Sequence, residues 1–431
     1  DLELCTVAGR LNLWSCDIRE GINLHAAAIG GLSLDGSEMS HLQASHLEVK
    51  GSVHMRRGFV ADGGVDLNGA RIGGQLGCNG GRFMNPDGQA LTAQGAVING
   101  DVLFRDGFQA EGAVNLSGAI LRGQLECVRG SMRAEEDSAF ALQGTKVAEI
   151  FYWRDMDVAA GNVVLTGADI GALADDTKSW PEDGRLMMDG FRYGRFVYTD
   201  TTARRRLRWL AKHTSNAFQP QPYQQLARVI GEMGQRYDRG KVLIEMEERL
   251  RVQQRRDMRA GGNRVHAWAR PGWNGLRAGL HWVWDRLLRL VVGYGYRPWR
   301  AFIGAIVLIA LVWAVSAKVW QSGDFAPNAA PVLVSAGWQD LALDPARANP
   351  AADWSRNDGP GRDYETFRAW IYAVDVVVPI VNLGQDDAWA PSTSRGAWGR
   401  FAHGTEWIVR VLGWVITALA AGAVAGVIRN E

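Results

Sequence analysis

The sequence is poor in cysteine and lacks the short motifs that bind cofactors. Its four cysteines form no CxxC pair and no metal-ligand cluster, so we expect reduced core residues. They are Cys5, Cys16, Cys78 and Cys127. The glycine-rich run GGQLGCNGG at residues 73–81 matches neither GxGxxG nor the P-loop pattern. Four histidines have spacings that match no known pair of metal ligands: His25, His41, His46 and His54. We therefore expect no cofactor, no metal site and no catalytic residue.

No signal peptide is visible in the sequence, and its net charge is only +1. The sequence does not begin with a basic segment followed by an apolar run. It does not tell whether the native chain extends before Asp1. The 47 Lys and Arg almost balance the 46 Asp and Glu. Their distribution is uneven, since residues 1–200 hold 17 basic against 27 acidic side chains and residues 201–431 hold 30 against 19. An acidic front half thus precedes a basic back half.

The front half repeats itself. The segment GVDLNGARIGGQLGC at 64–78 returns as AVNLSGAILRGQLEC at 113–127 and in part as NVVLTGADIGAL at 162–173. One apolar position recurs every 20 to 26 residues, and Gly-x-Val or Gly-x-Leu keeps the same spacing. The apolar positions are Ile29, Val49, Ile72, Ile98, Leu121, Val147 and Ile170. Short alternating strands separated by glycine at this period predict a parallel β-helix of about seven turns over residues 1–200.

Two known groups resemble this half. A spacing of five links Leu24, Ile29 and Leu34, which resembles the pentapeptide-repeat proteins, whose units build a four-sided right-handed β-helix. The Gly-x-Val spacing is similar to that of bactofilins, whose β-helices polymerise as scaffolds. Both resemblances imply a β-helix, and the second implies that its surface binds a partner protein or a copy of itself.

Residues 201–262 change to a helical period. Leu226, Ile230 and Met233 share one helix face, and a second apolar stripe begins at Val242, so we predict a helical hairpin. Residues 201–260 carry 14 Lys and Arg against 6 Asp and Glu, without an aromatic stacking pattern or a nucleic-acid-binding motif. Contact with anionic lipid is the better interpretation, and we expect no nucleic-acid partner.

Two apolar runs predict membrane spans at residues 299–320 and 405–429. Before the first, residues 263–298 predict an amphipathic helix at the membrane surface and an elbow. Four arginines there would face lipid: Arg286, Arg289, Arg297 and Arg300. The second run has small residues for helix packing: Gly413, Gly422 and Gly426.

The basic residues set the orientation. Residues 261–300 hold 7 Arg and one acid, whereas residues 318–368 hold 5 basic and 7 acidic side chains. The positive-inside rule therefore predicts a cytoplasmic N-terminal domain and C-terminus, with residues 321–404 outside a bacterial inner membrane. The Gly-Tyr-Gly at 293–295 resembles a potassium-channel filter but precedes the first span, so it fits the elbow better.

Between the spans, a loop at 321–364 precedes a re-entrant element at 365–391. Asp363 can cap a helix from about Tyr364 that Pro379 must end. The order of span, short helix, turn and span resembles the pore module of two-span tetrameric cation channels, although the TVGYG filter is missing. Candidate pore-lining residues are Asp375, Asn382, Gly384 and Gln385. The alternative for Asp375 is an interfacial pair with Arg368 or Arg410.

Three functions follow from these patterns. The first is an oligomeric, ion-channel-like pore with a cytoplasmic β-helix that senses or assembles. The second is a membrane-anchored β-helix scaffold without transport activity. The third is a membrane-associated oxidoreductase, because the chain also resembles bacterial membrane proteins that carry this label, but no motif in the sequence supports it.

Overall fold

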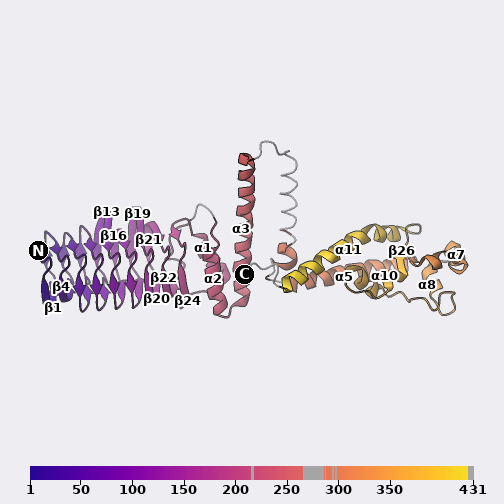
Figure 1. Ribbon diagram of the computed structural model, residues 1–431, viewed down its shortest axis with the longest axis horizontal. Helices are drawn as coiled ribbons and strands as arrows, with labels where there is room; N and C mark the ends of the chain where they lie inside the picture. The colour runs from indigo at the N-terminus through magenta and orange to yellow at the C-terminus, as the bar shows by residue number, and fades with distance from the viewer. Residues whose placement is uncertain (215–217, 266–285, 287, 294–295, 297–298, 426–431) are drawn as a thin grey trace. The chain divides into compact units, whose positions relative to one another are not determined.

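The computed structural model describes residues 1–214, 218–265, 286, 288–293, 296 and 299–425. It divides into two compact units, Asp1–Gly262 and Asn263–Glu431. The first unit is a parallel β-solenoid followed by helices, and the second contains two long apolar helices, which confirms the predicted fold class (Figure 1).

The solenoid is built from short strands. Their bounds are β1 Thr6–Asn12, β2 Asp17–Ile18, β3 Ile22–Asn23, β4 Ala28–Ser33, β5 Glu38–Met39, β6 Leu42–Gln43, β7 Glu48–Val49, β8 Val53–His54, β9 Val60–Ala61, β10 Val65–Asp66, β11 Arg71–Ile72, β12 Leu76–Gly77, β13 Arg82–Thr92, β14 Val97–Ile98, β15 Val102–Arg105, β16 Gln109–Asn115, β17 Ile120–Leu121, β18 Leu125–Val128, β19 Ser131–Ala141, β20 Lys146–Arg154, β21 Asp157–Val164, β22 Asp169–Asp175, β23 Leu186–Met187 and β24 Arg192–Phe196.

The strands stack turn upon turn into two parallel sheets, one running from β1 to β24 and the other from β2 to β23 (Figure 1). The apolar row predicted from the repeat is one continuous ladder of paired residues. Val7 extends this ladder at the start and Tyr193 at the end. The solenoid therefore has about eight turns, against the seven expected.

A row of stacked glycines explains the recurring Gly-x-Val. A Cβ on Gly100 would meet the backbone of Gly74 at 2.9 Å, and one on Gly51 would meet the carbonyl oxygen of Gly30 at 2.8 Å. Three of these glycines also donate their N–H to the glycine one turn earlier: Gly51 to Gly30 at 2.9 Å, Gly74 to Gly51 at 2.8 Å and Gly100 to Gly74 at 2.9 Å. The chain needs glycine here because consecutive turns approach too closely for any side chain.

The core is apolar throughout and becomes aromatic toward its end. Phe140 stacks on Trp153, which contacts Trp180, which in turn contacts Trp209 of the following helix. Cys78 and Cys127 are buried in this core, whereas Cys5 and Cys16 are partly exposed, and all four are free thiols. Burial raises the pKa of the Cys78 thiol, which therefore stays protonated and unreactive.

Three helices follow the solenoid. They are α1 Ala203–Ala211, α2 Gln221–Glu232 and α3 Arg236–Val265. The sequence predicted α2 and α3 as a hairpin, with a break where Gly234 now has a positive φ of 83°, but it missed α1. Helix α2 covers the last strand, since the Gln225 side-chain amide donates to the carbonyl oxygen of Tyr193 at 2.7 Å. This cap closes the open end of the solenoid core.

The second unit is helical. Its elements are the π-helical turn η1 Leu288–Val292, α5 Trp299–Gln321, β25 Phe325–Pro327, α6 Ala330–Leu333, α7 Ala336–Leu343, α8 Pro350–Trp354, α9 Ala369–Val377, α10 Gln385–Ala388, β26 Trp389–Pro391 and α11 Ala397–Val424. The segment expected to be a loop at 321–364 thus contains three short helices. The unit has an aromatic core, which is formed by Trp320, Phe325, Phe367 and Trp389.

The helix expected from Tyr364 is shorter than predicted. It begins at Ala369, so Asp363 does not cap it, and it ends at Val377, two residues before Pro379. Helix α11 begins at Ala397, ahead of the span predicted at 405–429. Its start is fixed by the buried Asp324, whose Oδ2 accepts the N–H of Gly399 at 3.0 Å.

Candidate functional site

The carboxylate of Asp375 belongs to α9, in the segment between the two apolar helices. It is buried on α9 and accepts three backbone N–H groups. Oδ1 accepts from Leu383 at 2.5 Å, and Oδ2 accepts from Gln385 at 2.7 Å and Asp386 at 3.3 Å. Neither Arg368 nor Arg410 pairs with it, which corrects the alternative expected from sequence. Asp375 therefore holds the loop at 378–384 and the start of α10 in place.

The side chain of Gln385, like that of Asp375, makes its hydrogen bonds within the chain. Its side-chain nitrogen donates to Glu365 at 2.8 Å and to the Thr366 carbonyl at 3.0 Å, and its side-chain oxygen accepts the N–H of Arg368 at 2.8 Å. The side chain is 1% exposed, so it joins the two ends of the element rather than facing a solvent path.

The other two candidate residues lie at the loop surface. The exposed Asn382 donates to Oδ2 of Asp387 at 3.1 Å and accepts the N–H of Gly384 at 2.9 Å. Gly384 has a positive φ of 81°, a conformation that suits glycine at the turn into α10. Between Pro379 and this turn, Ile380 is 76% exposed, and Leu383 is 47% exposed. The loop tip thus presents apolar side chains outward.

Helix α9 packs closely on α11. A Cβ on Gly413 would lie 2.1 Å from the carbonyl oxygen of Val377, so only glycine allows this approach. One turn earlier on α11, Arg410 pairs with Asp386 at 3.0 Å and with Glu406 at 2.8 Å. The ion pairs and the close contact together join the α9–α10 element to α11.

These contacts fix the depth of the element along α11. The uncharged part of α11 begins at Val411, directly after Arg410, and Gly413 is two residues further on. The C-terminal end of α9 therefore lies beside the first turn of the uncharged part of α11.

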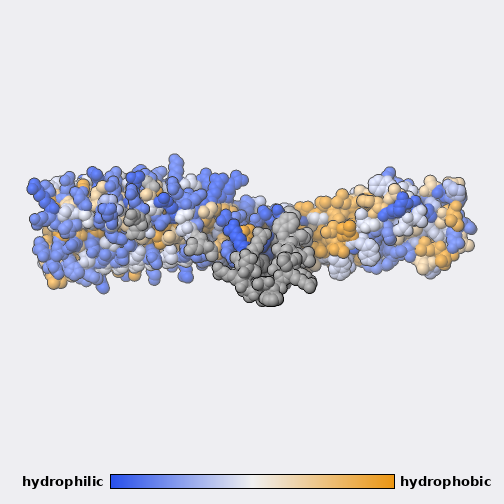
Figure 2. All heavy atoms as spheres, turned by 90° about the horizontal axis from the view of Figure 1, so that it is seen from above, coloured by the Kyte–Doolittle hydropathy of each residue, from blue (hydrophilic) through white to orange (hydrophobic). Residues whose placement is uncertain are grey.

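Both long helices present apolar side chains outward. α5 over Trp299–Gln321 and α11 over Ala397–Gly422 are long and apolar enough to cross a membrane, and only 11% of the most apolar window of each is buried. A core helix of a soluble protein would be mostly buried. Figure 2 shows the resulting hydrophobic band on the second unit. The exposed residues include Phe302, Ile303, Ile306, Leu311 and Trp313 of α5, and Trp407, Ile408, Val411 and Trp414 of α11.

The remaining residues singled out from sequence are scattered. Arg286 and Arg289 are exposed near η1, and the Arg300 guanidinium lies 6.0 Å from the centre of the Trp299 ring. Gly422 is a partly exposed residue of α11. Arg297 and Gly426 lie outside the described residues, as do residues 266–285 of the expected surface helix and Tyr294 and Gly295 of the elbow.

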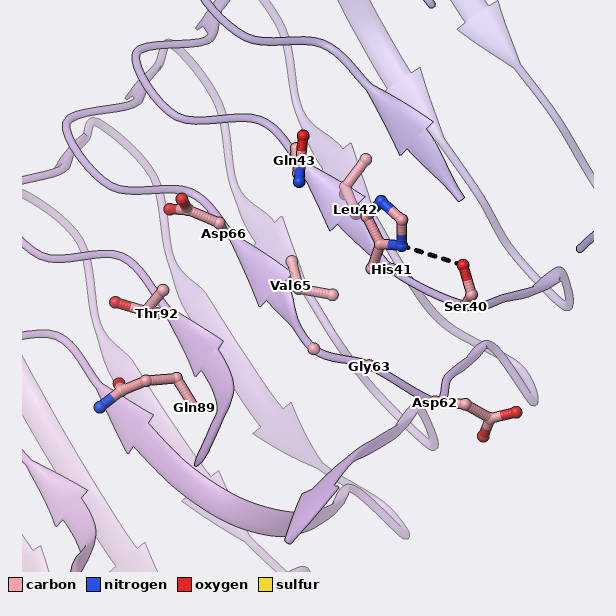
Figure 3. A pocket seen from close by; sticks show the side chains of 11 residues that line it. Ser40, His41, Leu42, Gln43, Asp62, Gly63, Val65, Asp66, Gln89 and Thr92 are labelled. Atoms are coloured by element: carbon pink, nitrogen blue, oxygen red, sulfur yellow. Dashed lines mark hydrogen bonds between the residues drawn. The ribbon is translucent and has the colours of Figure 1, made fainter. Parts of the chain in front are cut away.

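A groove on the solenoid gathers polar groups near its start (Figure 3). Its volume is about 450 Å³, and the Ser40 hydroxyl lies 2.9 Å from Nδ1 of His41. Asp62 points away from this pair (Figure 3). A nucleophile, base and orienting acid would have to be linked in series, so the groove does not contain a catalytic triad.

Sequence reasoning missed a buried ion pair at the other end of the solenoid. The guanidinium of Arg206 on α1 donates to both carboxylate oxygens of Asp175, at 2.8 and 2.7 Å. Trp180 and Thr199 complete the hydrogen bonds of this carboxylate at 2.6 and 2.7 Å. All four hydrogen bonds to the Asp175 carboxylate are made within the chain, so the ion pair fastens α1 to the solenoid. Arg206 could not be singled out in the sequence, because it lies in the run ARRRLRWLA, whose arginines resemble exposed surface charge.

No cluster of three or more His, Cys, Asp or Glu side chains that could hold a metal ion occurs in the part of the chain that the structure describes. Comparisons with models of protein families, with curated proteins and with solved structures found no match to this chain. The chain is thus a β-solenoid followed by a unit with two apolar helices long enough to cross a membrane.

Proposed function

We propose that the protein is a membrane-anchored scaffold. In this proposal α5 and α11 cross the membrane, and the solenoid presents a rigid surface to a partner protein. The outward-facing apolar side chains of both helices support the anchor, since lipid is the environment in which they are stable. A solenoid supports the scaffold, because stacked turns form an extended binding surface.

The proposed orientation follows the charges. The solenoid and the C-terminus lie in the cytoplasm, and residues 321–404 lie on the other side, in agreement with the arginines before α5. A bacterial inner membrane is the proposed location. The exposed arginines near η1 would contact lipid head groups.

The observation that favours the scaffold over the pore is the hydrogen bonding of Asp375. Its oxygens accept three backbone N–H groups, and Gln385 is likewise satisfied within the chain. Polar rings in a pore must instead turn toward the ion path. In the scaffold, the same bonds stiffen a loop whose exposed Ile380 and Leu383 rest in the outer membrane interface.

An oligomeric, ion-channel-like pore is the second candidate. It is favoured by the place of α9, which packs on both α5 and α11 and enters the outer end of the apolar run. In this candidate several copies would surround an axis, with Asn382 at the mouth. No catalytic step is part of either candidate.

An ion-flux assay on liposomes separates the two candidates. The full chain would be reconstituted and the flux of potassium and sodium compared with that of empty liposomes. The scaffold predicts no additional flux. A flux that Asn382→Ala alters and that Gly404→Ala leaves unchanged would favour the pore, because Gly404 on α11 has no atom within 4 Å of an added Cβ.

A further inference from the structure

A second groove, on the solenoid flank next to α2, carries an unusual concentration of positive charge. We call it the basic groove, and its volume is about 630 Å³. The charged side chains that line it are four cations and one carboxylate, all exposed: Arg122, Lys146, Arg192, Arg228 and Asp169. The surrounding domain has the opposite charge, since residues 1–200 hold 27 acidic against 17 basic side chains. The basic groove is therefore a region of positive charge on a domain whose net charge is negative.

The floor of the basic groove is made of residues with little or no side chain. These floor residues follow one another on successive turns, and each comes directly after a residue of the apolar ladder in the sequence. They are Ala148, Gly171 and Gly194. A Cβ on Gly171 would lie 2.4 Å from the Ala148 carbonyl oxygen, and one on Gly194 would lie 2.6 Å from that of Gly171. This row leaves a trough parallel to the solenoid axis.

Charged residues line one side and both ends of the trough. Lys146, Asp169 and Arg192 stand directly above one another in neighbouring strands, at ~4.8 Å per turn. Arg122 occupies the floor position one turn before Ala148 and so closes one end, and Arg228 of α2 closes the other. Among the described residues, Arg122, Lys146 and Arg192 have no ion pair within 4.0 Å, and Arg228 donates to Gln225 at 3.0 Å. Three of the four cations thus remain available to an anion.

We propose that the basic groove binds an acidic peptide segment of a partner protein, in an extended conformation along the trough. This inference rests on the scaffold function and names the site and the chemistry of its partner. Carboxylates on one side of the peptide would meet Lys146, Arg192 and the terminal arginines, because clusters of Arg recognise acidic motifs. A floor without side chains lets a peptide backbone approach closely.

A peptide suits the basic groove better than a nucleic acid. A nucleic acid is a long polyanion and would extend beyond the trough onto acidic surface, whereas an acidic peptide can confine its charge to a few residues. The side chains that line the groove also offer no exposed aromatic ring on which a base could stack.

The test is fluorescence anisotropy of a fluorescein-labelled oligoglutamate peptide with the full chain in detergent. We expect Lys146→Glu combined with Arg192→Glu to weaken binding at least about tenfold, because like charges then face each other. Asp169→Asn removes the one carboxylate in the row and is expected to tighten binding, a gain that misfolding cannot produce. Ala148→Trp fills the trough without changing its charge and is expected to weaken binding.

The matched control is Arg82→Glu, an equal reversal of an exposed charge on β13 in the other sheet. Binding that is equally weakened by this control, or that ignores the groove variants, would overturn the proposal. Tighter binding of a DNA oligonucleotide through the same residues would replace the peptide with a nucleic acid. Liposome flotation of the same preparation tests the anchor separately, so failure of the groove and failure of the scaffold remain distinguishable.

Discussion

Gln385 donates its backbone N–H to Oδ2 of Asp375 at 2.7 Å, and this bond joins two residues that are ten positions apart in the sequence. We expect Asp375→Ala to leave the N–H groups of Leu383 and Gln385 without a partner. The C-terminal unit should lose about 1–3 kcal/mol of stability, the usual cost of an unsatisfied buried group. Hydrogen exchange should accelerate at residues 383–386 and remain unchanged in the solenoid. Equal exchange in the variant and the parent would contradict this role.

The contact between Gly413 and Val377 gives a sharper test of helix packing. Gly413→Ala places a Cβ 2.1 Å from a carbonyl oxygen, so we expect a loss of about 1–3 kcal/mol from forced separation of α9 and α11. Gly404→Ala is the matched control on the same helix, because it meets no atom within 4 Å. Thermal unfolding in detergent should separate the two variants. A Gly413 variant as stable as the Gly404 variant would show that the two helices do not pack in this way.

The glycine row makes a similar prediction for the solenoid. Gly100→Ala would bring a Cβ to 2.9 Å from the backbone of Gly74, and the turns would have to move apart. We expect a loss of about 1–3 kcal/mol, measured by the thermal loss of β-sheet circular dichroism. Gly9→Ala, with no neighbour within 4 Å, should change it little. Similar melting of both variants would refute the steric explanation of the repeat.

The buried pair of Arg206 and Asp175 should matter more than its exposed neighbour. Arg206→Met leaves a buried carboxylate without its counter-charge, and we expect a loss of about 3–5 kcal/mol. Arg205→Met removes a pair with Asp200 that is about half exposed, and its effect should stay below about 1 kcal/mol. Urea unfolding of the two variants measures the difference. Comparable losses would mean that the buried pair does not fasten α1.

His54 predicts a pH dependence. Its partial burial, followed by the charge of Arg56, lowers the pKa of His54 below its ordinary value, against a smaller opposing effect of Asp35. The unfolded chain therefore binds more protons than the folded one, so stability is full above the unfolded pKa of about 6.5 and falls as the pH drops below it. Replacing His54 with Asn should reduce the loss of thermal stability between about pH 7 and pH 5. An unchanged loss would contradict the assignment.

The repeat could be recognised in the sequence because an apolar ladder residue recurs every 20 to 26 residues. Its two ends were missed for a physical reason, since Val7 and Tyr193 lie outside the GAxI unit that defines the repeat. Tyr193 pairs with Ile170 of the preceding turn and contacts Trp209 of α1 where a further turn would otherwise follow. Terminal turns of a solenoid face a different neighbour and therefore differ in sequence.

The hydrogen-bond partners of the candidate site, in contrast, could not be predicted from the sequence. Composition marked Asp375 as an unusual carboxylate in an apolar stretch, and it is buried there. Its partners are backbone N–H groups, which every residue except proline carries, so no pattern of side chains could reveal them. Arg206 was hidden for a related reason, because its partner Asp175 is distant in sequence and only the fold brings them together.

Liposome flotation of the full chain after an alkaline wash tests the anchor most directly. We predict that the full chain floats with the lipid, whereas a chain ending at Gly262, which lacks α5 and α11, stays in the dense fraction. Replacing the exposed Leu311 near the middle of α5 with Arg should reduce the floating fraction, since a charge at the centre of a span costs about 3 kcal/mol. A full chain that separates from lipid as completely as the shortened one would show that α5 and α11 do not anchor the protein.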